Sequence, residues 1–344
     1  MPSDLVLITG TTGHVGFKVL VDALKLGYSV RAAIRDPSKQ ADILATKSIK
    51  ALNPGSRLSF VIVPEITADG AYDEAVKGVK YIIHIASPIA KPSIKSEEFE
   101  TQLIAPAVKG TVGMLQSAHK TAGIKRIAIT GSIVAIADTM AFLSESQKVF
   151  NESSTTDALT PPYSHVFVAY CTSKIAAHKA TKEFVTKEKP AFDIVTLMPS
   201  YVIGKNELVT DPKKITDGTN GLAFRLVLGE NGNTTAGCSV HVDDVAKAHV
   251  LALDPKIPAN SDFILNSGGS DGTVWGTAAD IVAENFPQAV AAGILPNNGS
   301  MPTLKMKINA SKAEETFGFK FLSFEEQVKS VAAHYLELVG AKVA

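Results

Sequence analysis

Short apolar runs alternate with longer amphipathic segments over the first 200 residues of the chain. Continuous apolar runs of this length predict buried strands, whereas apolar residues that recur every three or four positions predict helices. The predicted strands are residues 5–9, 28–34, 58–63, 81–85, 126–130 and 193–198. The predicted helices are residues 15–26, 72–76, 99–122 and 168–187. This alternation predicts an α/β fold in which a doubly wound parallel (Rossmann) sheet is covered on both faces.

The alternation stops at Pro199. Residues 203–240 are rich in Gly, Asn, Thr and Lys, and three amphipathic segments follow, at 245–253, 274–286 and 324–338, with a short strand at 263–265. We therefore predict a first domain over residues 1–199, to which residues 241–267 return. A smaller lobe is predicted from residues 200–240 and 268–344.

The composition excludes several classes of protein. The chain has 344 residues, with 34 Lys and Arg against 34 Asp and Glu, so nothing in the net charge favours nucleic acid or an anionic membrane. Only two cysteines are present, Cys171 and Cys238, which is too few for a disulfide framework. No apolar run reaches about 18 residues, and Met1–Asp4 carries no cationic leader. These features lead us to expect a soluble, cytoplasmic protein.

A glycine-rich turn follows the first predicted strand. It contains Gly10, Thr12, Gly13, His14, Val15 and Gly16. The first glycine permits a tight turn, the second permits close approach of a pyrophosphate, and the third permits close packing of helix on strand. The alternative is a purely structural turn, but its place between strand and helix favours dinucleotide binding, and hence a dinucleotide-binding first domain.

The end of the second predicted strand indicates which dinucleotide is bound. Asp36 lies near the position at which a carboxylate usually binds the ribose of NAD, but Arg35 precedes it and Lys39 follows. A guanidinium can stack on adenine and bind a 2′-phosphate. We therefore favour NADP(H) over NAD, with a solvated loop cation as the alternative for Arg35.

Three residues form a candidate catalytic set. Tyr170 and Lys174 are four positions apart at the start of a predicted helix, so they share one helix face. A nearby ammonium lowers the pKa of a phenol and makes it a better acid–base group. Ser132 follows the fifth predicted strand, at the sheet edge where ligands bind in open α/β folds.

With these motifs the sequence resembles the extended short-chain dehydrogenases/reductases. Within them it is most similar to the fungal NADPH-dependent aldehyde and ketone reductases of the methylglyoxal reductase type and to the plant dihydroflavonol reductases. The resemblance extends over nearly the whole chain. It includes residues 9–16, 30–37, 81–88, 106–115, 130–132, 170–174, 199–204, 241–252 and 308–318.

The resemblance implies roles for matching residues. Tyr170 would protonate a carbonyl oxygen as hydride arrives from the nicotinamide, Lys174 would lower the Tyr170 pKa and bind the ribose, and Ser132 would polarise the carbonyl. Arg35, with Lys39 as a helper, would bind the 2′-phosphate. Further cofactor contacts are implied for Glu65, Ile66, Ala86, Ser87, Pro199, Ser200 and Val202. Glu65 is longer than the aspartate usual in this family, and Gly131 replaces a serine that is frequent in this branch.

The substrate site is predicted only in outline. Apolar residues near the inferred reaction centre are Ile89, Val134, Val166, Phe167 and Tyr201, with Phe224 as a cap from the smaller, substrate-binding lobe. Such a pocket would suit small hydrophobic aldehydes or ketones, although each residue is equally consistent with ordinary packing.

Two other functions remain open on the sequence alone. One is an NAD-dependent sugar-nucleotide epimerase or dehydratase, and the other a non-catalytic redox sensor that binds NADP(H). The histidines form no metal-binding motif, and Cys171 has no His–Asp set that would make it a nucleophile. We expect a monomer or a homodimer without a metal.

Overall fold

The computed structural model describes residues 4–90 and 93–341; Met1–Ser3, used above for the leader, lie outside them. The chain divides into two compact units. Unit 1 contains residues 1–139, 152–198 and 246–263, and unit 2 contains residues 140–151, 199–245 and 264–344. The division therefore differs from the predicted one mainly at residues 140–151, which belong to unit 2.

Unit 1 is built on a sheet of seven strands in the order β11-β7-β5-β4-β1-β2-β3. The bounds are β1 (Leu5–Thr9), β2 (Ser29–Ile34), β3 (Leu58–Ile62), β4 (Tyr81–His84), β5 (Arg126–Thr130), β7 (Asp193–Pro199) and β11 (Ser261–Leu265). The strands from β3 to β7 pair in parallel, as predicted from their apolar runs. The last strand, β11, extends the sheet beyond β7 and continues into unit 2.

The strand order reverses at β1. From β1 the chain builds outward through β2 to β3, and it then returns to place β4 on the other side of β1, where Ile8 pairs with Ile83. At such a switch point the loops after the two central strands diverge, which leaves a crevice at the carboxyl edge of the sheet. The predicted phosphate-binding turn follows β1 and therefore lies at this point.

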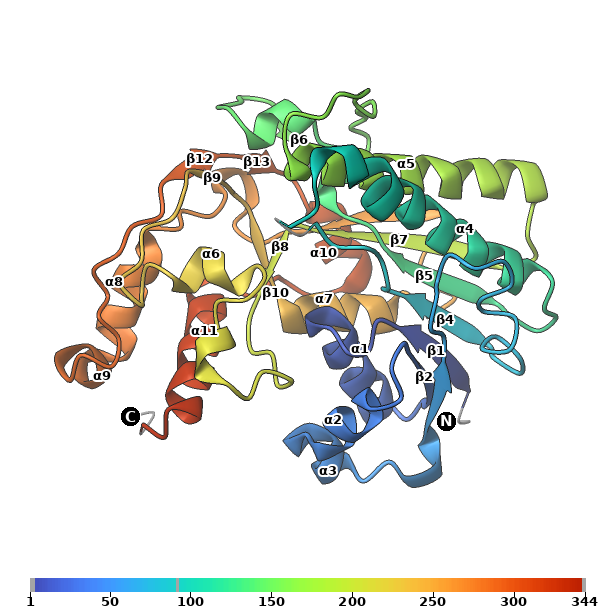
Figure 1. The fold of residues 1–344 in the computed structure, drawn as a ribbon, viewed down its shortest axis with the longest axis horizontal. Coiled ribbons are helices and arrows are strands. Elements are labelled where there is room, and N and C mark those ends of the chain that lie inside the picture. The colour runs from blue at the N-terminus through green and yellow to red at the C-terminus, as the bar shows by residue number, and fades with distance from the viewer. Residues whose placement is uncertain (1–3, 91–92, 342–344) are drawn as a thin grey trace. The chain divides into compact units, whose positions relative to one another are not determined.

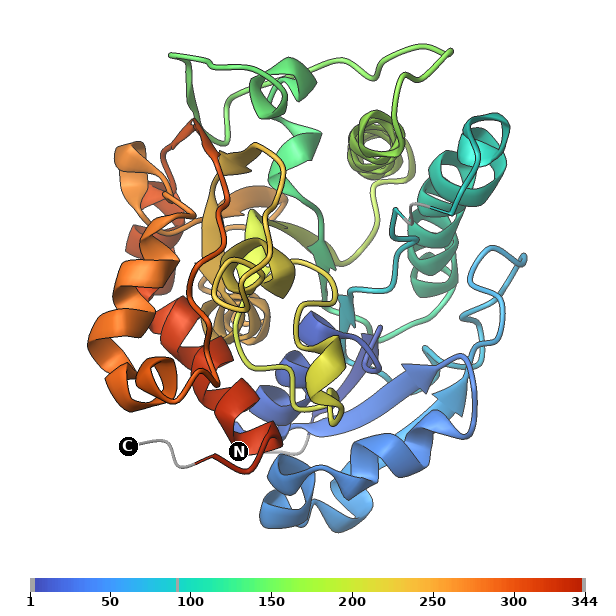
Figure 2. The same cartoon turned by 60° about the vertical axis from the view of Figure 1, so that its left-hand side comes forward.

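Helices cover both faces of the sheet. Figures 1 and 2 show α4 (Ala105–His119) and α5 (Val166–Glu188) on one face and α1 (His14–Lys25) on the other. Two shorter helices, α2 (Lys39–Ala45) and α3 (Lys47–Leu52), follow β2. Buried apolar side chains join α4 and α5 to the strands; they include Leu7, Ile82, Met114, Leu115, Ile127, Phe184 and Ile194.

Two predicted helices of unit 1 differ from the structure. Residues 71–78 form successive turns rather than a helix, because Gly70 and Gly78, both with positive φ, bound a segment that is too short to propagate one. The predicted helix at 99–122 begins as a π-helical segment (Glu100–Ile104), and α4 starts only at Ala105, beside Pro106. Proline is favoured at this first helical turn because it has no N–H to donate.

Unit 2 combines three two-stranded parallel sheets with short helices. The strand pairs are β8 (Tyr201–Ile203) with β10 (Ser239–His241), β9 (Thr235–Gly237) with β12 (Thr303–Lys305), and β6 (Val149–Phe150) with β13 (Lys307–Ile308). The helices are α6 (Asn220–Phe224), α8 (Thr277–Asn285), α9 (Pro287–Ala291), α10 (Ser311–Phe317) and α11 (Phe324–Leu338). Their core surrounds Trp275, whose indole N–H donates to the Ala236 carbonyl.

A final helix, α7 (Val242–Leu251), leads from unit 2 into unit 1. Its first turn contains Asp243 and Asp244, and acidic residues are favoured near a helix N-terminus by the helix dipole. In residues 4–90 and 93–341, no helix has the length and apolar character that a membrane span requires.

The contact between Gly16 and Gly10 predicts a stability effect. A Cβ on Gly16 would lie 2.0 Å from the Gly10 carbonyl oxygen, so Gly16→Ala must displace the backbone of the turn. We expect a loss of about 2–3 kcal/mol in the free energy of unfolding, measured by urea denaturation. The matched control is Gly276→Ala, where a Cβ meets nothing within 4 Å. Equal stability of the two variants would contradict the packing argument.

Candidate active site

The turn after β1 has the geometry of an anion site. Gly10 has φ +75°, and a Cβ there would lie 3.0 Å from the Ala86 nitrogen, so only glycine fits without strain. Gly13 precedes α1 and offers no side-chain cap, and no acidic residue stands in the first helical turn. The first N–H groups of α1 therefore remain available to a phosphate, which the helix dipole also favours.

One hydroxyl joins the loops at the switch point. The Thr9 oxygen accepts hydrogen bonds from the Ile85 and Ala86 N–H groups, each at 3.0 Å, and lies 3.0 Å from His84 Nδ1. This arrangement ties the segment after β4 to the end of β1 and holds Ala86 against Gly10. No signal in the sequence identifies Thr9 as the partner of His84.

The cations after β2 differ in their partners. Arg35 is exposed, and in the described part of the chain it makes no ion pair. Lys39 pairs with Asp42 at 2.8 Å, so the predicted helper already has a carboxylate partner. Asp36 accepts a hydrogen bond from the Ser38 N–H, and Ser38 holds the pKa of this carboxyl below its usual range. Arg35 is thus the cation best able to meet a 2′-phosphate.

The predicted pair Glu65–Ile66 lies in the loop after β3. The Glu65 carboxylate accepts hydrogen bonds from the N–H and the hydroxyl of Thr67, at 2.9 and 2.7 Å, which lower its pKa. The Ile66 side chain packs on Gly110 of α4, where an added Cβ would approach it to 3.2 Å. Glu65 is therefore folded back onto its own loop, and Ile66 contributes to the core.

The structure brings the three candidate catalytic residues together at the carboxyl edge of unit 1. Ser132 lies two residues after the end of β5. Its side chain forms a hydrogen bond with Tyr170, near the start of α5. The Lys174 ammonium lies 5.7 Å from the centre of the Tyr170 ring and donates to the Ser87 hydroxyl at 3.0 Å. The four-residue spacing on α5 thus places phenol and amine in one cluster, as predicted.

The electrostatics differ from the prediction for Tyr170. Burial raises its pKa to about 12; the hydrogen bond from Ser132 opposes this rise, and Lys174 does not contribute to it. Burial also lowers the pKa of Lys174 to about 8. The ammonium therefore does not produce the expected lowering, and the pKa of the phenol is set mainly by desolvation. A phenol of this pKa is protonated at neutral pH, the form a general acid requires.

Several predicted residues belong to unit 2. Pro199 ends β7, the Ser200 N–H and hydroxyl both donate to the Leu265 carbonyl, and Val202 lies in β8. The ring of Tyr201 packs edge-on against Trp275. Phe224 does not fit the predicted cap, because it is fully buried in the core of unit 2.

The predicted pocket residues of unit 1 differ in their exposure and in their packing partners. Val134 is only 4 % exposed and belongs to the core, whereas Ile89 is 73 % exposed. Val166 packs in an apolar cluster with Phe99 and Leu103, and the Phe167 ring lies 6.4 Å from that of Tyr170. Phe167 and Val166 are therefore the apolar residues of this set that the structure places beside Tyr170.

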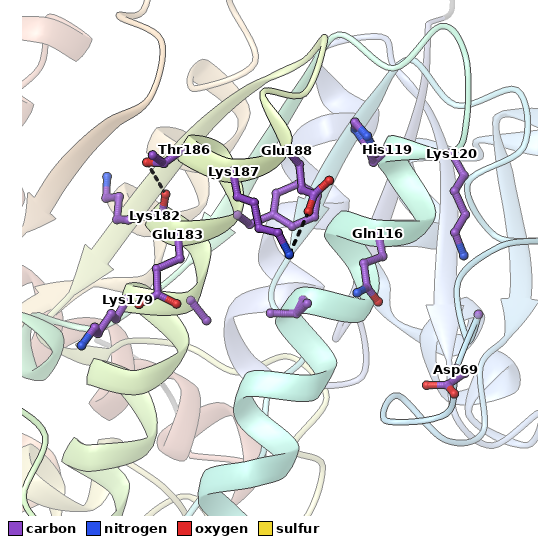
Figure 3. Close-up of a pocket in the computed structure, with 14 residues that line it drawn as sticks. Asp69, Gln116, His119, Lys120, Lys179, Lys182, Glu183, Thr186, Lys187 and Glu188 are labelled. Atoms are coloured by element: carbon purple, nitrogen blue, oxygen red, sulfur yellow. Dashed lines mark hydrogen bonds and ion pairs between the residues drawn. The ribbon is translucent and has the colours of Figure 1, made fainter.

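A cavity in unit 1 that does not coincide with this cluster lies at the other end of α5. It measures about 1210 Å³ and lies between the ends of α4 and α5, where Gln116 and His119 face Glu183 and Lys187 (Figure 3). None of the predicted site residues lines it. Within the described ranges no three His, Cys, Asp or Glu side chains are grouped to hold a metal ion.

A phosphate-binding turn at the switch point, with Ser, Tyr and Lys at the same sheet edge, is the arrangement of the short-chain dehydrogenases/reductases. The family model described as "NAD dependent epimerase/dehydratase family" matches residues 6–265. The chain belongs to this family, the extended branch of that class.

The relatives include reductases. The ketoreductase CTB6 of Cercospora nicotianae is 39% identical, with 98% of this chain and 96% of the relative aligned. The ketoreductase sphI of Aspergillus fumigatus is 31% identical over 99% of this chain and 100% of the relative. Among solved structures, yeast methylglyoxal/isovaleraldehyde reductase Gre2 complexed with NADPH matches with a TM-score of 0.81 and 25% identity, covering 98% of this chain and 100% of that one.

The lowered pKa of Lys174 predicts a pH-dependent stability. Its folded-state pKa of about 8 lies below the ordinary 10.5, so burial of the ammonium destabilises the folded protein below pH 8. Between pH 8 and 10.5 the folded state releases this proton first, and the penalty disappears. Lys174→Met should therefore raise the free energy of unfolding at pH 7 by about 2 kcal/mol, and this gain should vanish towards pH 10.5.

Urea denaturation across this pH range measures the effect. Lys179→Met is the matched control, because Lys179 is exposed on the same helix. A Lys174→Met variant that is less stable than the wild type at pH 7, by an amount that does not change with pH, would show that burial does not destabilise the ammonium.

Proposed function

We propose that the protein is an NADPH-dependent carbonyl reductase that reduces aldehydes or ketones to alcohols, with Tyr170 as the general acid. The observation that carries this proposal is the cluster at the carboxyl end of β5, in which the Lys174 ammonium lies 5.7 Å from the centre of the Tyr170 ring and Ser132 interacts with the same phenol. The ketoreductases among the relatives support a carbonyl substrate and favour this function over the epimerase alternative.

The residues present fit a nicotinamide dinucleotide. The uncapped start of α1, the glycine contacts around Gly10 and the unpaired cation of Arg35 meet the needs of a pyrophosphate and a 2′-phosphate. The likeness to a reductase complexed with NADPH supports NADP(H) as the cofactor. Ala86 and Ser87, tied to the phosphate turn through Thr9, would contact it, as would Lys174.

The bound cofactor would supply hydride to the carbonyl carbon. Negative charge then develops on the carbonyl oxygen, and the Tyr170 hydroxyl donates its proton to that oxygen. Ser132, which hydrogen-bonds the same phenol, positions it and offers a second polar contact to the substrate oxygen. Lys174, whose ammonium lies 5.7 Å from the centre of the Tyr170 ring, would bind the ribose of the cofactor and so hold the cofactor beside the phenol. Phe167 and the exposed Ile89 would form an apolar entrance for a small hydrophobic substrate.

Tyr170→Phe tests the general acid. Removal of the hydroxyl should lower kcat by about 10²- to 10⁴-fold, because the alkoxide loses its proton donor, while NADPH affinity and stability stay near wild type. The assay follows NADPH oxidation with methylglyoxal or another activated carbonyl compound. Tyr163→Phe is the control, since that hydroxyl is a surface group that donates to Glu100 at 3.5 Å. An active Tyr170→Phe enzyme would refute the role of Tyr170.

Arg35→Leu tests the cofactor preference. Loss of a charge-assisted contact to the 2′-phosphate should raise the Kd for NADPH by about tenfold or more, with little change for NADH. Fluorescence titration of each dinucleotide measures the ratio, and Lys50→Leu, at an exposed position on α3, controls for loss of a surface charge. An equal loss of affinity for both dinucleotides would rule out 2′-phosphate recognition by Arg35.

A further inference from the structure

A small polar cavity lies in unit 1 beside Lys174. Its volume is about 20 Å³, and the residues around it include His84, Ser87, Thr111, His178 and Thr181. A cavity of this size can hold one water molecule but not a sugar, a nicotinamide or a substrate ring. Two of the side chains that line it carry a buried nitrogen with no hydrogen-bond partner among the described residues.

The first of these nitrogens is a donor. The Thr9 hydroxyl already accepts from two backbone N–H groups, so its single proton is directed to His84 Nδ1. Burial, reinforced by the Lys174 charge, lowers the pKa of His84 to about 3, so the ring is neutral. A neutral ring that accepts at Nδ1 carries its proton on Nε2. This Nε2–H is buried and unpartnered, on a residue that is 2 % exposed.

The second nitrogen is an acceptor. His178 lies one helical turn after Lys174 on α5, and its Nε2 is 3.4 Å from an oxygen of Asp262. Lys182 pairs with the other oxygen at 2.6 Å. Burial raises the pKa of Asp262, but the hydrogen bonds from His178 and Lys182 outweigh it and keep the group ionised. With Nε2 directed to this carboxylate, Nδ1 is the ring nitrogen left without a partner at the cavity, and in the tautomer that carries its proton on Nε2 it is an acceptor.

The remaining polar groups around the cavity supply further hydrogen-bond donors and acceptors. The hydroxyls of Thr111 and Thr181 donate to the carbonyls of Ala107 and Ala177 in their own helices, which leaves their lone pairs as acceptors. The Lys174 ammonium uses one proton on Ser87 and has others to donate. The cavity therefore offers donors from His84 and Lys174 and acceptors from His178 and the threonines, which matches the two acceptor and two donor sites of a water molecule.

We propose that one water molecule binds in this cavity between His84, Lys174 and His178, and that His178 is a positioning residue that holds the Lys174 ammonium through this water. The groups around Lys174 explain why such a contact matters. Tyr170, His84 and His178 face it, and within the described residues no carboxylate lies close enough to form an ion pair with it. The charged form of Lys174 then depends on neutral acceptors, and this water is one of them.

A crystal structure of the wild-type protein that resolves ordered waters tests the site directly. We expect a water oxygen within about 2.7–3.2 Å of His84 Nε2, His178 Nδ1 and Lys174 Nζ. A dry cavity, or a water that does not contact both histidines, would overturn the proposal. This test needs no activity, so it separates failure of the water site from failure of the proposed function.

A pair of His178 variants tests the consequence for catalysis, which rests on the proposed function. In His178→Asn the amide oxygen stands where Nδ1 stood and still accepts from the water, whereas His178→Leu has no acceptor. Because a hydrogen bond to a charged group is worth about one unit of pKa, the alkaline limb of kcat should move about one pH unit lower in His178→Leu. In His178→Asn it should stay near the wild-type position.

The control is Lys182→Met, which removes the ammonium that pairs with Asp262 without touching the cavity and should leave the limb unchanged. An unshifted limb in His178→Leu, or equal shifts in the Leu and Asn variants, would refute the role of His178. If His178→Leu does not fold, the comparison of His178→Asn with wild type decides, because a shifted limb in the Asn variant contradicts the proposal.

Discussion

Burial of the Tyr170 hydroxyl against Ser132 is the constraint on which the proposed chemistry depends. A phenol withdrawn from water keeps its proton, and the hydrogen bond from Ser132 limits how far its pKa rises. The same burial acts in the opposite direction on Lys174, whose charged form becomes less stable. The cluster thus holds a protonated acid beside an amine that is close to losing its proton, and small changes in hydrogen bonding around Lys174 decide its charge.

The fold supplies this cluster through one feature of the sheet. The strand order reverses at β1, so the loops after β1 and β4 separate, and the Thr9 hydroxyl joins them again through Ala86 and His84. This bond places Ser87, the hydrogen-bond partner of Lys174, one residue after the segment that contacts Gly10. The candidate phosphate-binding turn and the cluster of Ser132, Tyr170 and Lys174 are therefore connected within unit 1 by a short and partly buried path.

The sequence predicted the features that depend on local patterns. Strand β1 and helix α11 were found at the predicted bounds, because their apolar residues recur with a clear period and clear end signals. The polar helix α2 was missed because it buries only Ile43, and residues 72–76 form turns because glycines enclose them. The direction of the Tyr170 pKa could not be predicted, since it depends on burial by residues distant in sequence. For the same reason Phe224 was expected at a pocket but lies in a core.

The titration of Tyr170 in the protein without cofactor tests the central claim most directly. Tyrosines labelled with ¹³C at the ring carbon that bears the hydroxyl report ionisation by NMR, and Tyr170→Phe identifies the signal of interest. The account predicts that this phenol ionises only near pH 12, above the ordinary pKa of 10.0 for a tyrosine, and that Ser132→Ala delays its ionisation further. A Tyr170 that ionises near neutral pH, or one that is insensitive to loss of the Ser132 hydroxyl, would contradict it.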